Sequence, residues 1–245
     1  MNESTTTKMK QMKLFGMHNA FKTAVETGKT DHFTIDQFVS MIIDAEWDER
    51  QNRRIERSIA NAKFHYRADI ENIRFDDNRG LDRTLVLRLA ECDFVEKNEN
   101  ILITGSTGVG KSYLATALGY KACIQGFKVS YFNTSKLFTR LKLAKADGSY
   151  LRELAKIQKQ DVILLDDFGL QALDSQNRIT LLEIIEDRHN NGSIIVTSQI
   201  PVQGWYDIIG EKTIADAVLD RLIHNAHRVE LLGESMRKKK NIDKQ

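Results

Sequence analysis

The chain has 245 residues, of which 41% are apolar and 29% are charged, and its 36 Lys and Arg residues against 34 Asp and Glu residues give a formal net charge of +2. This near balance excludes binding of nucleic acid through overall charge, so any such surface must be local. No segment approaches the roughly 18 apolar residues of a membrane span. Cys92 and Cys123 lack the spacing of a zinc site or a disulfide framework. We expect a cytoplasmic protein with no membrane partner.

Residues 1–75 predict a small all-α domain at the N-terminal end. Helical spacing covers 8–27 and 34–67, and Thr34 with Gln37 forms a capping-box pattern at the start of the second segment. An arginine-rich run follows at 50–57, in which Arg53 and Arg54 are candidate DNA-binding residues. Two interpretations are equally open for this run: a solvated helical face with i,i+4 ion pairs, or a surface for DNA, a partner or a neighbouring subunit.

Residues 76–245 predict a second domain of the α/β class, which ends in a basic tail. Strand segments are expected at 100–104, 128–132, 162–165, 194–197 and 227–232, and helices at 111–125, 134–144, 150–159, 176–190 and 213–225. Continuous runs of Ile, Val and Leu that alternate with helices are typical of a parallel sheet covered on both faces. The fold class is therefore a parallel sheet flanked by helices.

A phosphate-binding loop of the pattern G-x-x-x-x-G-K-S joins the first strand to the next helix. Its residues are Gly105, Ser106, Thr107, Gly108, Val109, Gly110, Lys111 and Ser112. The glycines let the backbone approach an anion closely, and the amides and the helix N-terminus surround it. Lys111 would reach the β- and γ-phosphates of ATP, and the Ser112 hydroxyl would bind Mg²⁺. The strand before and the helix after disfavour a glycine-rich turn with no ligand.

Two acids follow the buried strand at 162–165. The carboxyl ends of parallel strands form the edge where ligands of such sheets bind, so Asp166 is expected to hold Mg²⁺ with Ser112. Asp167 would then orient or deprotonate the attacking water. Two acids that only cap the strand are the alternative, which the phosphate loop upstream makes less attractive.

Polar residues also end the strand at 194–197. Thr197 is the candidate to sense the γ-phosphate or to position water, in preference to Ser198. Many strands end in threonine and serine, so this assignment depends on the phosphate loop and the two acids.

The helix expected at 134–144 carries three cations. Lys136, Arg140 and Lys142 are candidate contacts to DNA phosphates. An exposed amphipathic helix explains these residues nearly as well.

Together these motifs resemble a known family. The order of the phosphate loop, Asp166-Asp167, Thr197 and Asp220-Arg221-Leu222 is similar to the AAA+ ATPases of the initiator and helicase-loader group. The runs Leu182–Arg188, Val196–Gln199 and 220–228, with Gly-Glu-Ser-Met-Arg-Lys at 233–238, resemble the IstB-type transposition helper ATPases of insertion sequences. The resemblance covers about residues 75–240 closely and the N-terminal part more loosely.

The resemblance implies more than the spacing shows. Proteins of this type bind ATP, assemble as homo-oligomers, in a ring or a helix, on duplex DNA, and recruit or stimulate a partner transposase. Arg221 becomes a candidate arginine finger that acts in trans, and Arg237 a candidate second sensor that contacts the nucleotide of its own subunit. Ordinary surface arginines paired with nearby acids are the alternative for both.

Two other functions share the same ATPase core. One is the loading of a replicative helicase, as in the DnaC type, and the other is a DNA-binding scaffold in which ATP only holds subunits together. Many AAA+ proteins have glutamate where Asp167 stands, one methylene longer, so we expect slow hydrolysis, stimulated by DNA or by the partner.

Overall fold

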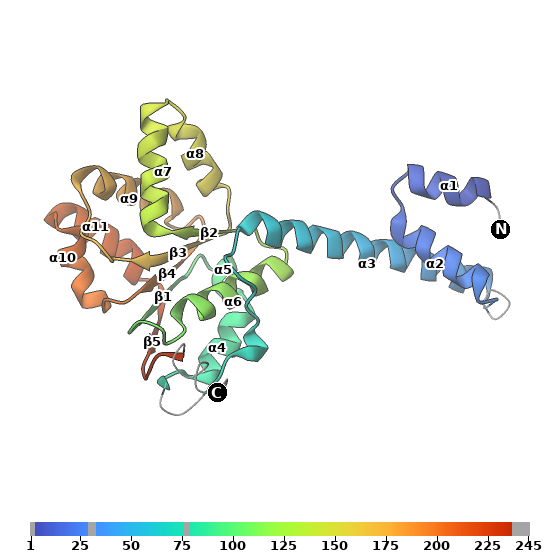
Figure 1. Cartoon of the computed structure of the whole chain (residues 1–245), viewed down its shortest axis with the longest axis horizontal. Helices are drawn as coiled ribbons and strands as arrows, with labels where there is room; N and C mark the ends of the chain where they lie inside the picture. Colours follow the sequence, from blue (N-terminus) through green and yellow to red (C-terminus); the bar gives the residue numbers. More distant parts are fainter. Residues whose placement is uncertain (1–2, 29–32, 76–78, 237–245) are drawn as a thin grey trace, which may run out of the picture. The chain divides into compact units, whose positions relative to one another are not determined.

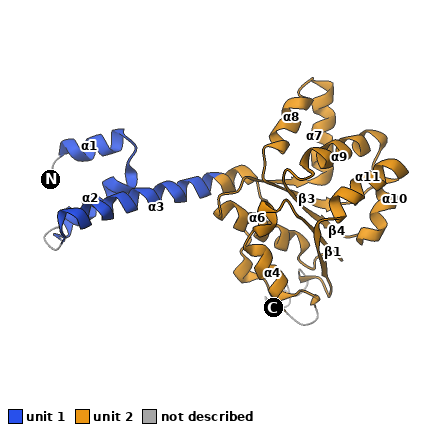
Figure 2. Cartoon of the chain, turned by 180° about the vertical axis from the view of Figure 1, so that it is seen from behind, with its two compact units in different colours: residues 1–57 blue, residues 58–245 orange. Residues whose placement is uncertain are grey.

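The computed structural model describes residues 3–28, 33–75 and 79–236. They divide into two compact units, Met1–Arg57 and Ser58–Gln245, which Figure 2 shows in different colours. The division lies before residue 75 because Ala62, Ala68 and Ile70 belong to the core of the second unit. No helix in the described parts of the chain is long and apolar enough to cross a membrane.

The first unit consists of helices α1 (Glu3–Gln11), α2 (Phe15–Glu26) and the first part of α3 (Ile35–Ala62). The single helix expected at 8–27 is wrong: it is broken at Lys13, whose φ is +59°. The capping box at the start of α3 is confirmed, since Thr34 N–H donates to Gln37 Oε1 (3.0 Å) and Gln37 N–H donates to Thr34 Oγ1 (3.2 Å). This reciprocal pair satisfies two backbone donors that the helix leaves open.

Helices α2 and α3 meet at a glycine and a buried carboxylate. A Cβ on Gly16 would lie 2.2 Å from the Ala45 carbonyl oxygen, so only glycine fits there. Glu46, from the next position of α3, accepts from the Gly16 N–H at 2.8 Å and from the Met17 N–H at 3.3 Å. Its carboxylate therefore caps the first turn of α2, where negative charge is favoured.

The second unit is a parallel sheet of five strands within the described residues, in the order β2-β3-β4-β1-β5 (Figure 1). The strands are β1 (Asn100–Gly105), β2 (Val129–Asn133), β3 (Val162–Phe168), β4 (Ser193–Ser198) and β5 (Ala226–Leu231). The helices are α4 (Arg83–Ala90), α5 (Asp93–Glu96), α6 (Lys111–Ile124), α7 (Thr134–Ala146), α8 (Tyr150–Gln158), α9 (Ser175–Arg188), α10 (Trp205–Ile209) and α11 (Lys212–Ile223), with short 3₁₀ turns at Ile70–Asn72 and Val202–Gly204. The expected α/β class is confirmed.

Each face of the sheet has its own hydrophobic core. Side chains alternate between faces along β1, so Ile101 and Ile103 pack with α4 and α6, whereas Leu102 packs with α7, α9 and α11. All strands are parallel, so their carboxyl ends lie along one edge and their amino ends along the opposite edge. The phosphate loop and the two acids follow the carboxyl ends of the strands, so they lie along the same edge.

Candidate functional site

The loop between β1 and α6 is shaped to surround an anion. Gly105 and Gly108 have φ values of +145° and +83°. A Cβ on Gly105 would lie 2.2 Å from the Leu231 carbonyl oxygen, and one on Gly108 would lie 2.2 Å from Ser235 Oγ. The 14-residue helix α6 begins directly after this loop. The close-packed backbone and the positive end of α6 together form the cradle that a phosphate group fits.

Lys111 is already directed at this loop. The side chain is buried, and its Nζ donates to the Ser106 carbonyl oxygen at 2.8 Å. A buried ammonium group beside the loop supplies the positive charge that a phosphate needs.

The end of the described chain is hydrogen-bonded to the same loop. Met236 N–H donates to the Gly108 carbonyl oxygen at 2.9 Å, and Ser106 Oγ donates to the Gly233 carbonyl oxygen at 3.5 Å. On the other side, buried Arg79 donates to the Val109 carbonyl oxygen at 2.6 Å. The segment before Arg237 thus reaches the loop, and Arg237 itself lies outside the described residues.

Asp166, the expected magnesium ligand, lies beside Ser112 at the carboxyl edge of the sheet. Its carboxylate is buried and accepts a 2.8 Å hydrogen bond from Ser112 Oγ. The hydroxyls of Tyr131 and Thr197 also donate to it. Burial, and then the hydrogen bond to Asp166, raise the pKa of Tyr131, which keeps this hydroxyl protonated. A carboxylate and a serine hydroxyl side by side at the mouth of a phosphate loop are ligands that suit Mg²⁺.

Asp167 has a backbone conformation that few side chains tolerate. Its φ is +60°, and the pairing of β3 with β4 is irregular between Leu165 and Phe168. The Asp167 N–H donates to Thr197 Oγ1 at 3.1 Å, and Asn133 Nδ2 donates to its carboxylate at 3.4 Å. These contacts turn the carboxylate out of the strand pattern and toward the edge that carries the phosphate loop.

Thr197 and Ser198 are both fully buried at the end of β4. Thr197 bridges the two acids, since its hydroxyl donates to Asp166 and accepts from the Asp167 backbone. The Ser198 hydroxyl bonds to backbone groups: it donates to the Phe168 carbonyl oxygen at 2.7 Å and accepts from the Ile200 N–H at 3.1 Å. Of the two, Thr197 is the residue in contact with the candidate metal ligand, and its role toward the γ-phosphate or the attacking water stays a prediction.

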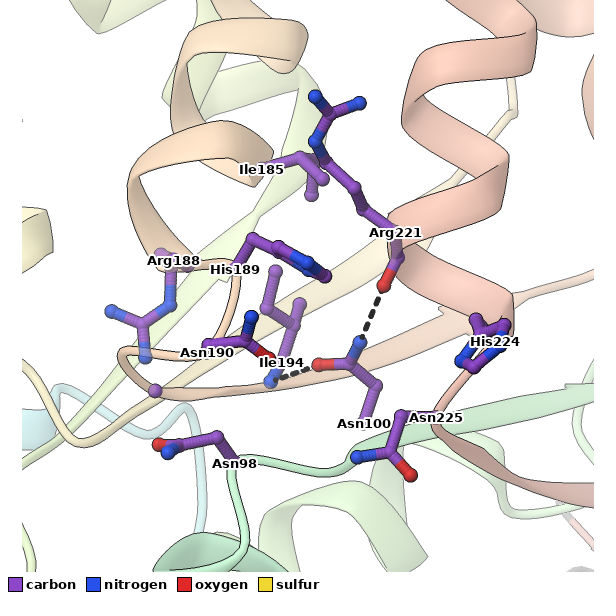
Figure 3. A pocket seen from close by; sticks show the side chains of 11 residues that line it. Asn98, Asn100, Ile185, Arg188, His189, Asn190, Ile194, Arg221, His224 and Asn225 are labelled. Atoms are coloured by element: carbon purple, nitrogen blue, oxygen red, sulfur yellow. Dashed lines mark hydrogen bonds between the residues drawn. The ribbon is translucent and has the colours of Figure 1, made fainter.

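Arg221 is not part of this cluster. It lies near the end of α11, and its backbone carbonyl accepts from Asn100, the first residue of β1 (Figure 3). The strand rises about 3.3 Å per residue, so its first residue lies about 17 Å from Gly105 at its other end. The Arg221 guanidinium is held by the Ala217 carbonyl oxygen at 2.8 Å and by Glu186 at 3.2 Å. Arg221 thus belongs to the edge opposite its own phosphate loop.

The five candidate DNA-binding residues differ in how firmly they are held. Arg140 is paired with Glu153 at 3.2 Å and lies over the Phe132 ring, and Lys142 lies 4.0 Å from Asp174. Arg53 is half-buried and paired with Glu46 and Glu49. Lys136 and Arg54 are exposed and have no ion-pair partner among the described residues.

Sequence reasoning missed three residues of the site. Tyr131 and Asn133 reach the two acids because β2 pairs with β3 so that Asn133 lies opposite Asp166. Arg79 supports the phosphate loop from a segment without any regular pattern. The strand order would have pointed to the first two, but it is not visible in a single sequence, and nothing in the sequence signals Arg79.

Comparison with known proteins shows the family of the chain. A family model described as IstB-like ATP binding protein matches residues 7–244. A protein of Sinorhizobium fredii named as an insertion sequence ATP-binding protein is 41% identical over 234 residues, which cover 96% of each chain. Another from Pseudomonas fluorescens is 38% identical over 202 residues, which cover 82% of this chain and 87% of that protein.

Solved structures share the fold of the second unit. The crystal structure of DnaI has a TM-score of 0.59 and 26% identity, and the match covers 67% of this chain and 91% of that chain. The DnaC helicase loader has a TM-score of 0.51 and 22% identity, over 71% of this chain and 98% of that chain. The AAA+ P-loop fold is thereby confirmed, and the chain belongs to the IstB-like family of insertion-sequence ATP-binding proteins.

Proposed function

We propose that this protein is an ATP-dependent, DNA-binding regulator of transposition. It assembles as a homo-oligomer on duplex target DNA, recruits or stimulates the transposase of the same insertion sequence, and hydrolyses ATP at subunit interfaces. The family membership and the insertion-sequence relatives support the biological setting. The position of Arg221 supports the hydrolysis of ATP at subunit interfaces.

The cluster at the carboxyl edge of the sheet supports the chemistry. The loop amides and Lys111 bind the phosphates of ATP. Ser112 and Asp166 would hold Mg²⁺, which would supply positive charge beside the phosphates. Asp167 orients the water that attacks the γ-phosphorus and accepts its proton as the bond to the ADP oxygen breaks. Thr197 keeps Asp166 and the Asp167 backbone in place through its two hydrogen bonds.

One observation carries the proposal of a shared site. Arg221, the arginine that would complete the site, lies at the edge of the sheet opposite the phosphate loop of its own subunit. The Arg221 carbonyl is hydrogen-bonded to Asn100, which lies about 17 Å along β1 from the end that carries the phosphate loop. Arg221 therefore cannot stabilise the γ-phosphate held by that loop. A neighbouring copy that presents its carboxyl edge to this amino edge brings Arg221 to the neighbour's ATP. An arginine supplied in this way stabilises the charge that develops during phosphoryl transfer.

A cavity of about 380 Å³ connects the site to the candidate DNA surface. Asp167 lines it together with Ser135 and Lys142 of α7, the helix that also carries exposed Lys136. DNA phosphates bound along this helix would therefore lie beside the residue that orients the attacking water. This proximity supports stimulation of hydrolysis by DNA.

The proposal is tested by mixing the protein with duplex DNA, with and without ATP, and by observing assembly with electron microscopy. We expect wild-type protein to form ordered oligomers on DNA with ATP. The Lys111→Ala variant should remain folded and fail to form them, because it lacks the phosphate-binding ammonium group. Assembly by this variant to the wild-type extent would contradict a role for ATP in assembly.

The partner is tested by co-purification with the transposase encoded beside this gene and with a replicative helicase. Retention of the transposase on the ATP-bound oligomer supports transposition. Retention of the helicase alone would favour the helicase-loader function, which the name of the DnaC helicase loader gives for that protein.

A further inference from the structure

A buried asparagine begins the strand that ends in the phosphate loop. Asn100 is 7% exposed and lines a cavity of about 470 Å³ at the amino edge of the sheet (Figure 3). The walls of this cavity are provided mainly by asparagine, histidine and arginine side chains. A buried amide needs partners for both of its hydrogens and for its oxygen.

Asn100 finds these partners on two different elements. Its Nδ2 donates to the carbonyl oxygens of Arg221 at 3.3 Å and of Leu222 at 3.2 Å, and its Oδ1 accepts from the Ile194 N–H at 3.0 Å. The two carbonyls belong to the last turn of α11, where the helix leaves carbonyl groups without partners. One side chain thus joins the last turn of α11 to the beginnings of β1 and β4.

The guanidinium of Arg221 points away from this anchor. Figure 3 shows the Arg221 side chain extending to the far side of its backbone from Asn100. Its Nη2 lies 3.2 Å from Glu186, and the side chains are 29% and 48% exposed respectively. An exposed ion pair of this kind is worth little and can be exchanged for another anion. The backbone of Arg221 is therefore held by a buried anchor on other elements, while its charged end is held by this exposed pair and by the Ala217 carbonyl oxygen of its own helix.

We propose that Asn100 is the positioning residue of the arginine finger. It fixes the backbone from which Arg221 reaches the ATP of the neighbouring subunit, and it ties that backbone to the strand that carries the subunit's own phosphate loop. The inference rests on the proposed role of Arg221 in trans. Misplacement of a catalytic group by about 1 Å costs about 100-fold in rate, so loss of the anchor is expected to slow hydrolysis without removing Arg221.

The variant Asn100→Asp isolates the anchor. It keeps the acceptor for the Ile194 N–H and replaces the amide donor by an oxygen that faces the two α11 carbonyls. We expect kcat to fall at least about tenfold, while the KM for ATP stays within about twofold because the nucleotide site is untouched. Asn98→Asp is the matched control, since Asn98 lines the same cavity and no hydrogen bond of its side chain is among those described. It should hydrolyse ATP at the wild-type rate.

Mixed oligomers decide whether Asn100 acts through the finger. Lys111→Ala subunits have no working phosphate loop and an intact Arg221, so their fingers can serve the ATP sites of Asn100→Asp subunits. We expect the mixture to hydrolyse ATP faster than the sum of its two components. If Asn100→Asp instead disturbs its own phosphate loop through β1, the mixture will hydrolyse ATP no faster than the sum of its components. That result would overturn the proposal.

Two further measurements keep the outcome clear. If thermal melting shows that Asn100→Asp is unfolded at the assay temperature, Asn100→Ser, which is neutral and donates at most one hydrogen bond, takes its place with the same expectations. Arg221→Ala is mixed with Lys111→Ala in parallel. Recovery with Arg221→Ala but not with the Asn100 variant overturns only the role of Asn100, whereas an Arg221→Ala variant with normal activity alone overturns the shared site itself.

Discussion

At the scale of single residues, the conformation of Asp167 explains which acid stands there. Its φ of +60° lies in the left-handed region, where aspartate and asparagine are several-fold enriched over other side chains. Glutamate, the usual residue in AAA+ proteins, gains a methylene of reach but lacks this preference. The shorter acid is therefore the one that fits the turned backbone, and Asn133 and Thr197 hold it there.

Asp167→Asn separates chemistry from structure at this position. Asparagine tolerates the same backbone conformation and has the same size, so we expect an unchanged melting temperature and unchanged ATP affinity by calorimetry. Turnover should fall about 100-fold or more, because the proton acceptor for the attacking water is lost. Normal turnover would remove Asp167 from the reaction.

At the scale of elements, the N-terminal unit depends on one buried acid between two helices. Burial raises the pKa of Glu46, but the hydrogen bond from Arg50 and those from the Met17 and Gly16 N–H groups together lower it by more, so it lies below its usual value. A carboxylate whose pKa is lower in the folded state stabilises that state above its unfolded pKa of about 4.3. This stabilisation is lost as the pH falls through the folded-state pKa.

Glu46→Gln tests this dependence. We expect the variant to be less stable than wild type near neutral pH, and its N-terminal helices to lose less stability than the wild-type helices as the pH is lowered below about 4. Hydrogen exchange of amides in α1, α2 and the start of α3 measures this in the full chain. Glu56→Gln, an exposed position on α3, is the control. An acid response identical in Glu46→Gln and wild type would show that this carboxylate does not contribute.

Elements were predictable from the sequence where the signal is local. The phosphate loop is contiguous, and Asp166 follows a strand of continuous apolar residues, so both were identified without strand order. The contact of Tyr131 with Asp166 was not, because it depends on β2 lying next to β3. The break at Lys13 was missed as well, since helical spacing continues through it although its φ is +59°.

At the scale of the whole molecule, the parallel sheet separates the phosphate loop from Arg221. The phosphate loop and the two acids lie at its carboxyl edge, and Arg221 lies at its amino edge beside Asn100. If Arg221 acts in trans, as we propose, a single subunit holds one half of each of two sites. Hydrolysis would then be linked to assembly, since a complete site would exist only where two copies meet, and DNA that brings copies together would complete it.

The most direct test of this claim is ATP hydrolysis by a mixture of two inactive variants. Lys111→Ala lacks the phosphate-binding side chain, and Arg221→Ala lacks the finger, so each alone should hydrolyse ATP at least about 100-fold more slowly than wild type. In an equimolar mixture on duplex DNA, the Arg221→Ala subunits still bind ATP and are expected to bring Lys111→Ala subunits into the oligomer. About a quarter of the interfaces then pair an intact loop with an intact Arg221, and activity should return to about a quarter of the wild-type rate. If Arg221→Ala is fully active alone, or if the mixture stays as inactive as its components, the site is not shared between subunits.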